Sequence, residues 1–108
     1  MSETAVQVSG ATLWADYQAN EVAADDKYKG KRLLVSGSVA GIDKSGLTGE
    51  SVILKLATAN QFMPISAEMQ DEEKSKAAKL SKGDSVKLLC SGNGMTLGFL
   101  HLGDCTLR

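Results

Sequence analysis

The sequence is poor in aromatic residues, in proline and in net charge. Only five aromatic side chains and one proline occur among its 108 residues, so stacking platforms for nucleobases would have to be built from very few rings. The 12 basic and 13 acidic residues leave a formal net charge of −1, which excludes a strong overall positive field that would attract nucleic acid. No apolar run approaches the roughly 20 residues of a membrane-spanning helix, so we predict no membrane insertion.

The N-terminal segment also lacks the basic start and the apolar stretch of a signal peptide. As it stands, the sequence predicts a cytoplasmic protein, whereas a leader preceding Met1 would predict a periplasmic one. The two cysteines fit an oxidising compartment if they are paired and a reducing one if they are not. The compartment, the native N-terminus and the oligomeric state therefore stay open at this stage.

The length of 108 residues suits one domain, and 43% hydrophobic residues allow a real core. We interpret residues 1–9 as a flexible tail and residues 10–108 as the domain. Apolar residues recur at spacings of three and four over residues 11–28, which indicates a helix, and Thr12 is its expected N-cap. Residues 71–80 are expected to form a second, short helix with a solvated polar face.

Alternating apolar residues predict five strands, at residues 31–43, 52–57, 62–69, 85–91 and 98–107. In the first strand Leu33, Val35 and Val39 share one face, and Gly37 marks a bulge or a sharp coil. Pro64 argues that the third is an edge or bulged strand. This order predicts an all-β fold, a five-stranded OB barrel with an N-terminal helix and a helix between the third and fourth strands.

Residues 90–105, CSGNGMTLGFLHLGDC, contain three glycines within seven residues. They do not form a phosphate-binding loop of the known kinds, because those motifs require a following helix and here a strand follows. A hairpin fits better, in either of two registers. A two-residue turn at Leu97–Gly98 would put Cys90 opposite Cys105, and Gly98 would supply the positive φ that a type II turn needs.

A turn two or three residues earlier would instead put Leu88 opposite Leu102, which suits the hydrophobic pattern. A bulge at Gly103–Asp104 could then bring Cys105 back inside. A disulfide and two buried thiols are both compatible with these patterns. Our hypothesis is a Cys90–Cys105 disulfide under oxidising conditions, which would contribute roughly 3 kcal/mol for a loop of about 15 residues.

Two segments resemble the bacterial tRNA_anti-like OB domains. Residues 13–39 carry that family's helix motif, Y-x-x-N-E-x-x-A-D-x-x-Y, followed by K-G-K and V-x-G-x-V. Residues 79–107 carry KGDSVKLLCSG and, later, LGDC. The resemblance covers roughly residues 12–107, with the largest departures between residues 43 and 79. It implies an OB barrel, and members of the family are often small exported proteins or lipoproteins whose nucleic-acid binding is inferred largely from the fold.

No catalytic centre or metal site is predicted. His101 is the one histidine of the sequence, and no nucleophile motif accompanies it, so a catalytic triad cannot be assembled. Cys90, Cys105 and His101 lack the spacing of a zinc site. We therefore expect a non-enzymatic protein that uses no metal or other cofactor, with His101 on the surface of a strand.

Four residues of the N-terminal helix have both a structural and a ligand-binding interpretation. We expect Trp14 and Tyr17 to cap the barrel core rather than to stack on bases. Asn20 and Glu21, which the family motif carries, are expected to bond the connection from the helix to the first strand. Neither pair is therefore assigned to a binding site.

OB barrels bind ligands on the face of their second and third strands and in the flanking loops, here residues 43–51 and 92–96. We predict a nucleic-acid-binding site at six residues: Lys31, Arg32, Lys44, Lys55, Phe62 and Asn93. Four scattered cations would neutralise few phosphates, so the affinity should be weak and strongly salt-dependent. Two functions follow. One is weak binding of single-stranded nucleic acid, and the other is a protein-interaction or envelope-stress module with no nucleic-acid role.

Overall fold

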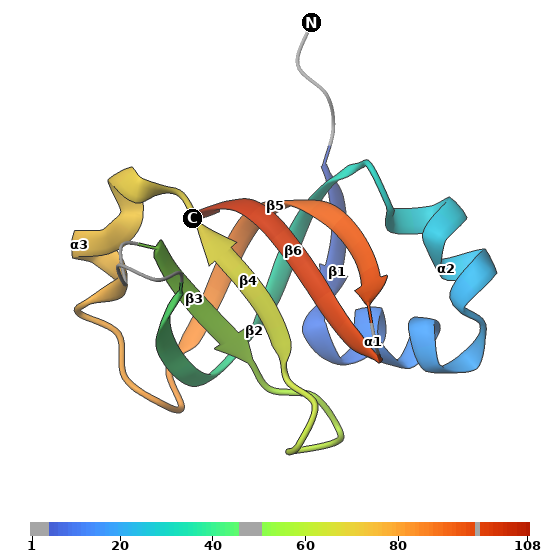
Figure 1. Ribbon diagram of the computed structural model, residues 1–108, viewed down its shortest axis with the longest axis horizontal. Coiled ribbons are helices and arrows are strands. Elements are labelled where there is room, and N and C mark those ends of the chain that lie inside the picture. Colours follow the sequence, from blue (N-terminus) through green and yellow to red (C-terminus); the bar gives the residue numbers. More distant parts are fainter. Residues whose placement is uncertain (1–4, 46–50, 97) are drawn as a thin grey trace, which may run out of the picture.

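The computed structural model describes residues 5–45, 51–96 and 98–108, and its strands close into a barrel (Figure 1). The strands are β1 (Val6–Ser9), β2 (Arg32–Ser45), β3 (Ser51–Leu56), β4 (Ile65–Met69), β5 (Ser85–Thr96) and β6 (Phe99–Leu107). The helices are α1 (Gly10–Ala19), α2 (Glu21–Tyr28), the 3-10 helix η1 (Asp71–Glu73) and α3 (Lys74–Ala77). The strand order is β1-β2-β3-β4-β6-β5, and pairing of β2 with β5 closes the barrel. The predicted five-stranded OB barrel is confirmed, with β1 as an additional strand.

The long strand β2 belongs to both sides of the barrel. Its residues 32–38 pair antiparallel with β5, and residues 39–45 pair antiparallel with β3. The register shifts between Val39 and Gly41, two residues beyond the coil predicted at Gly37. A side chain added at Gly37 would contact Leu56. The small residues at this point let the strand turn from one neighbour to the other.

The inner faces of the strands form the core. The predicted inner face of β2 is confirmed, because Leu33, Val35 and Val39 are each at most 2% exposed. The other strands contribute Leu54, Leu56, Ile65, Ala67, Met69, Leu88, Leu100 and Leu102. Burial of each large side chain stabilises the fold by about 1.5–3 kcal/mol relative to exposure, so the barrel interior is the main source of stability.

The helix predicted over residues 11–28 is two helices. Ser9, and not Thr12, caps α1, because its hydroxyl accepts the backbone N–H of Thr12 at 3.1 Å. Asn20 has extended backbone and caps α2 by accepting the N–H of Ala23 at 3.1 Å. Asn20 therefore has the structural role that was expected, but it bonds the junction between two helices and not the connection to a strand. Glu21 lies exposed in the first turn of α2.

Two tyrosines fasten α1 to α2. Tyr17 donates a hydrogen bond to Asp25 at 2.9 Å, Tyr28 donates one to Asp16, and the two rings are 6.2 Å apart. Burial, together with the hydrogen bond to Asp16, raises the pKa of Tyr28 to about 12, while this hydrogen bond lowers the pKa of Asp16. Tyr17 is a core residue as predicted, and Trp14 packs partly buried against the same core. The tyrosines of the helix motif therefore have structural roles.

The hairpin of β5 and β6 has the register with its turn at residues 97–98. Thr96 pairs with Phe99 and Met95 with Leu100. Gly98 has a φ of 84°, a conformation that suits glycine, whereas Leu97 lies outside the described residues. The first of the two predicted registers is therefore the one that forms.

The predicted disulfide is present between Cys90 and Cys105, and both residues are fully buried. The ladder of β5 with β6 shifts between Leu89 and Ser91. Asp104 has a φ of 51°, so a bulge occurs near Gly103–Asp104, where it was predicted only in combination with the other register. The bulge keeps Cys105 facing the barrel interior, where Cys90 lies.

Two element boundaries and one strand position differ from prediction. Residues 6–9, which were assigned to the tail, form β1 and pair parallel with β2. The reason is that β2 offers backbone hydrogen-bond partners that no local sequence pattern reveals. Residues 1–4 lie outside the described part. β4 begins after Pro64 and pairs with β3 and β6 on its two sides, so it is not an edge strand, and the register shift between Ala67 and Met69 bears out the other predicted alternative, a bulged strand. The helix predicted over 71–80 is reduced to η1 and α3, which ends at Ala77.

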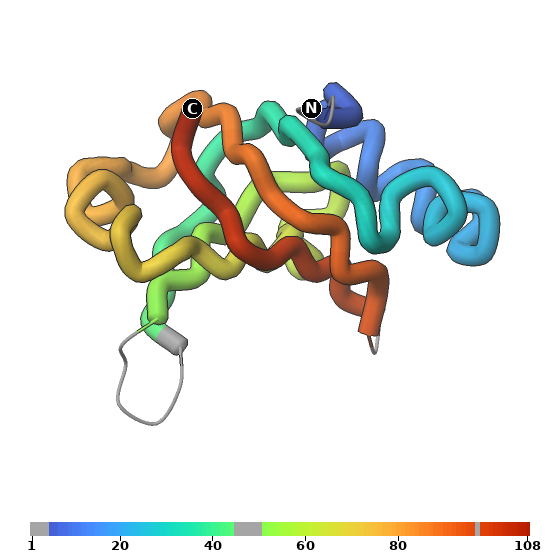
Figure 2. Tube along the Cα trace, turned by 90° about the horizontal axis from the view of Figure 1, so that it is seen from above, coloured from blue at the N-terminus to red at the C-terminus, as the bar shows by residue number. Residues whose placement is uncertain are grey.

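The polar face of this helix is also less solvated than expected. The side chain of Glu73 is buried, and its Oε1 accepts the backbone N–H of Leu107 at 2.7 Å. The acid therefore ties η1 to the end of β6. Figures 1 and 2 show α3 at one end of the barrel and α1 with α2 at the other, so the strand faces between them stay open.

Candidate functional site

The basic residues predicted to bind nucleic acid do not gather in one place. Lys31 and Arg32 lie at the start of β2, where Lys31 donates to the carbonyl oxygen of Asp26 at 2.7 Å and Arg32 donates to Ser91 at 3.3 Å. Lys44 lies near the opposite end of β2. Lys44 is therefore separated from Lys31 and Arg32 by the length of β2, so the three cations do not form one cluster.

Lys44 and Lys55 also lie on different sides of the sheet. Lys44 pairs with Val52, which packs against the core. Lys55 pairs with Ser66 of β4 and donates a hydrogen bond to its hydroxyl at 2.9 Å. Paired residues project to the same side of a sheet, so of these two lysines Lys55 is the one on the outer face.

The outer face of β3, β4 and β6 has a depression of about 360 Å³. Residues that line it include Ile53, Ser66, Glu68, Asn93, Thr96 and His101. The amide of Asn93 lies directly over Gly103, where a Cβ atom would come within 2.5 Å of Nδ2. His101 is half-buried on this face. The surface that OB domains use for ligands is therefore present, with Asn93 and Lys55 of the predicted residues close to it.

Carboxylates outnumber cations in the depressions on and beside this outer face. Glu68 lines the depression and also a neighbouring one of about 420 Å³, which Asp71, Glu72 and Asp104 share. The ammonium group of Lys55 is already bonded to a hydroxyl. A phosphate chain placed here would meet several negative charges. The charge on this face therefore opposes the predicted nucleic-acid site.

Two other grooves have the opposite character. One, of about 620 Å³, lies over β2 and β5, and the other, of about 630 Å³, lies beside the loop between β3 and β4. Ser38 lines both, so the grooves adjoin. Among the described residues, the lining of the two grooves includes Lys82, Lys87 and Arg108 and no aspartate or glutamate side chain. This surface is the positively charged one.

Phe62 stands beside the second groove on an ordered loop. Thr58 donates from its hydroxyl to the carbonyl of Met63, and the side chain of Asn60 accepts the backbone N–H of Phe62 at 2.9 Å. These bonds hold the loop while the phenyl ring remains 79% exposed. The methyl group of Met63 lies near Gly98 at the β5–β6 turn, so this loop and this turn are neighbours. Of the six predicted residues, Phe62 alone reaches the positively charged grooves.

Sequence reasoning missed Lys82, Lys87 and Arg108. The alternation of β5 does place Lys87 outside, since its neighbours Val86 and Leu88 point inward. However, Lys87 joins the groove because β5 pairs with β2 at Ser36. This register depends on closure of the barrel and has no local signature.

The barrel and its open depressions define an OB-fold binding module. The chain belongs to the tRNA_anti-like family, whose match spans residues 1–106. In the described part of the chain, no group of three or more His, Cys, Asp or Glu side chains could hold a metal ion. No helix in the described ranges is long and apolar enough to cross a membrane.

Solved structures share this fold at low sequence identity. A Klebsiella pneumoniae protein described as a "putative nucleic acid-binding lipoprotein" has a TM-score of 0.78 and 17% identity, with 96% of this chain and 92% of that chain covered. OBody AM1L10, solved bound to hen egg-white lysozyme, has a TM-score of 0.54 and 17% identity over 76% of this chain and 83% of its own. A Leishmania major "putative aspartyl-tRNA synthetase" has a TM-score of 0.63 and 10% identity over 99% of this chain and 21% of its own. No curated protein sequence matches this chain.

Proposed function

We propose that this protein is a non-enzymatic binding module that binds single-stranded nucleic acid weakly. The observation that carries the proposal is Phe62, a phenyl ring 79% exposed on a loop that is itself held by hydrogen bonds. Such a ring contributes little to the core, yet it offers a fixed surface on which any base can stack. Phe99, 43% exposed in β6 next to the β5–β6 turn, supplies a second ring near the same end of the barrel.

The wider context agrees with this ligand class. The OB barrel is a frequent scaffold for oligonucleotides, and the Klebsiella protein of similar structure is described as a nucleic-acid binder. The near-neutral net charge and the small number of exposed rings limit the affinity. We therefore expect dissociation constants in the micromolar range or weaker, the range of non-specific binding.

The test is a fluorescence-anisotropy titration with single-stranded DNA and RNA oligonucleotides of mixed sequence at low salt. Phe62→Ala should weaken binding about tenfold, the effect of losing one stacked base. Val22→Ala is the matched control, because Val22 is 77% exposed on α2, away from the barrel's strand faces. The absence of binding by the unmodified protein at about 100 μM would contradict the proposal, since non-specific affinities usually reach that range.

A protein partner is the second candidate. It is favoured by the outer face of β3, β4 and β6, where Glu68, Lys55 and His101 mix both signs of charge around the half-buried Ile53. The OBody shows that an OB scaffold can hold a folded protein. Ile53→Arg should abolish capture of such a partner from a periplasmic extract while leaving oligonucleotide binding intact. Retention of that partner by the variant would count against this face.

We further propose that the protein works in an oxidising compartment outside the cytoplasm. The support is the buried Cys90–Cys105 disulfide, a bond that persists in such compartments, together with the lipoprotein description of the Klebsiella structure. Alkylation of denatured cell fractions should find both thiols blocked in the native source. Free thiols in freshly quenched cells would contradict the proposal.

A further inference from the structure

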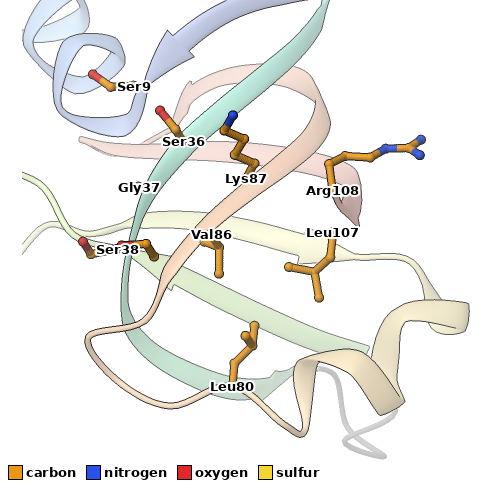
Figure 3. A pocket seen from close by; sticks show the side chains of 10 residues that line it. Ser9, Ser36, Gly37, Ser38, Leu80, Val86, Lys87, Leu107 and Arg108 are labelled. Atoms are coloured by element: carbon orange, nitrogen blue, oxygen red, sulfur yellow. The ribbon is translucent and has the colours of Figure 1, made fainter.

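A polar row crosses the barrel on the side of β2 and β5 (Figure 3). Ser9 of β1 neighbours Ser36 of β2, and Ser36 pairs with Lys87 of β5. The backbone N–H of Arg108 donates to the carbonyl of Lys87 at 2.9 Å, which continues the row past β5. Because paired residues project to one side of a sheet, two hydroxyls and two cationic side chains share one rim of the first groove. Figure 3 shows this rim with Arg108 at its far end.

The groove has an apolar floor below this rim. Leu80, Val86 and Leu107 converge on the same space in Figure 3. At one end the pair Ser38 and Ser85 lines the wall, and Ser38 also borders the second groove. The surface therefore continues from the cationic rim to the second groove, which Lys82 and the exposed ring of Phe62 line.

The three cations of the two grooves are available to a ligand. In the part of the chain that the structure describes, the ion pairs are Lys27 with Asp16 and Lys76 with Glu73, and none engages Lys82, Lys87 or Arg108. Arg108 does act on Glu73, where its charge helps to lower the pKa of the carboxyl group. Glu73 is only 6% exposed, does not line the groove and accepts the N–H of Leu107. It therefore leaves the outward side of Arg108 free.

The two grooves differ from the outer face of β3, β4 and β6 in the sign of their charge. Their lining brings together three cations and seven neutral hydroxyl or amide side chains, whereas the depressions of the outer face contain four carboxylates. Cations and hydroxyl groups are the side chains that bind phosphate oxygens. An aromatic ring at one end adds a surface for a base.

We propose that the two grooves form one binding track for a phosphate-bearing chain. Phosphates bind along the row of Ser36, Lys87 and Arg108, and a base stacks on Phe62 beside Lys82. The track lies over β2, β5 and the β3–β4 loop, and not on the outer face of β3, β4 and β6. The identity of the bound ligand as a single-stranded nucleic acid rests on the proposed function, whereas recognition of its phosphates by the track does not.

Charge reversal separates the two surfaces. Lys82→Glu and Lys87→Glu change exposed residues of the track, and Lys55→Glu is the charge-matched control on the outer face. With an oligonucleotide, Lys87→Glu should lower affinity about tenfold, the effect of one charged hydrogen bond, and Lys55→Glu less than about twofold. Lys87→Glu should also reduce the slope of log affinity against log salt by about 0.7, the value for one phosphate on a single strand. Thermal unfolding of each variant verifies that the fold is retained.

A second probe, inorganic tripolyphosphate, is followed by NMR shifts of the backbone amides of β2 and β5. Oligonucleotide binding that weakens in Lys87→Glu and Lys82→Glu supports both proposals. Binding that weakens in Lys55→Glu instead overturns the track and leaves the proposed function standing. Tripolyphosphate shifts around Ser36 and Lys87 without oligonucleotide binding support the track and overturn the proposed function. No response to either probe overturns both.

Discussion

The β5 segment at residues 90–94 and the loop at residues 58–64 differ in what their residues do. Residues 90–94 are the more conspicuous in the sequence, yet Cys90 and Gly92 among them have structural roles. Cys90 forms the disulfide, and a Cβ atom on Gly92 would lie 2.3 Å from the carbonyl oxygen of Tyr28. Gly92 also exchanges backbone hydrogen bonds with Gly30 and Lys31, so the glycine is where the chain leaving α2 meets the barrel.

The loop at residues 58–64 uses its polar groups to shape itself. Thr58 and Asn60 bond the loop backbone and leave Phe62 exposed. In the β5 segment the unusual composition is therefore explained by tight packing and by the disulfide. Exposure of an apolar ring on an ordered loop is the more informative signal. Three of the four predictions that follow test this contrast, and the prediction for Glu73 tests a further contact within the fold.

Loss of the disulfide should have the largest effect. The double variant Cys90→Ala, Cys105→Ala should lose about 3 kcal/mol of unfolding free energy, the contribution of a disulfide that closes a loop of about 15 residues. Urea unfolding monitored by circular dichroism measures it. Reductant should destabilise the unmodified protein and leave the double variant unchanged. A loss below about 1 kcal/mol would show that the barrel does not depend on this bond.

Gly92→Ala should have the next largest effect. The added methyl group would overlap the Tyr28 carbonyl. Overpacking of this kind lowers the free energy of unfolding by about 2 kcal/mol. Gly41→Ala is the matched control in β2, where the nearest atom to a new Cβ is 4.0 Å away. Chemical unfolding of the two variants compares them. Equal stability would mean that the contact between Gly92 and Tyr28 relaxes without strain.

Glu73→Gln should alter the acid sensitivity of the fold. The hydrogen bond from the Leu107 backbone holds the pKa of Glu73 below its ordinary value of 4.5. A pKa that is lower in the folded state stabilises the protein above the ordinary value, and this stabilisation is lost as the pH falls through the folded value. The unfolding temperature of the unmodified protein should therefore fall more steeply below about pH 4.5 than that of Glu73→Gln. The exposed neighbour Glu72→Gln should follow the unmodified protein.

Phe62→Ala should have the smallest effect on stability. The ring is largely exposed, so the free energy of unfolding should change by less than about 0.5 kcal/mol. Its effect on oligonucleotide affinity should nevertheless be clear. A destabilised variant with unchanged affinity would reverse the contrast between the loop and the β5 segment, because the ring would then belong to the fold.

Much of the barrel could be predicted because alternation has a local cause. Successive strand residues face opposite sides, so Leu33, Val35 and Val39 could be assigned to the core. For the last hairpin the same rule left two registers open, and the Cys90–Cys105 disulfide was a hypothesis that the structure confirms. The break at Asn20 was missed because helical spacing continues across it, and the cap that starts α2 is a side-chain hydrogen bond.

The candidate site was predicted less well, because its members come from distant segments. The four cations chosen from the sequence lie on separate parts of the barrel, whereas Lys87 meets Ser36 through the pairing of β5 with β2. Glu73 looked like a surface acid, and it is buried because the end of β6 passes over η1 and supplies an N–H group. Both outcomes depend on long-range contacts.

The sequence by itself determined the order of the five predicted strands along the chain and the inner face of the first, and it limited the last hairpin to two registers. These features follow from side-chain periodicity and from glycine conformation within single segments. The tertiary structure alone decided which outward residues share a surface. Closure of the barrel sets the register between β2 and β5, and that register places Lys87 beside Ser36 on one surface.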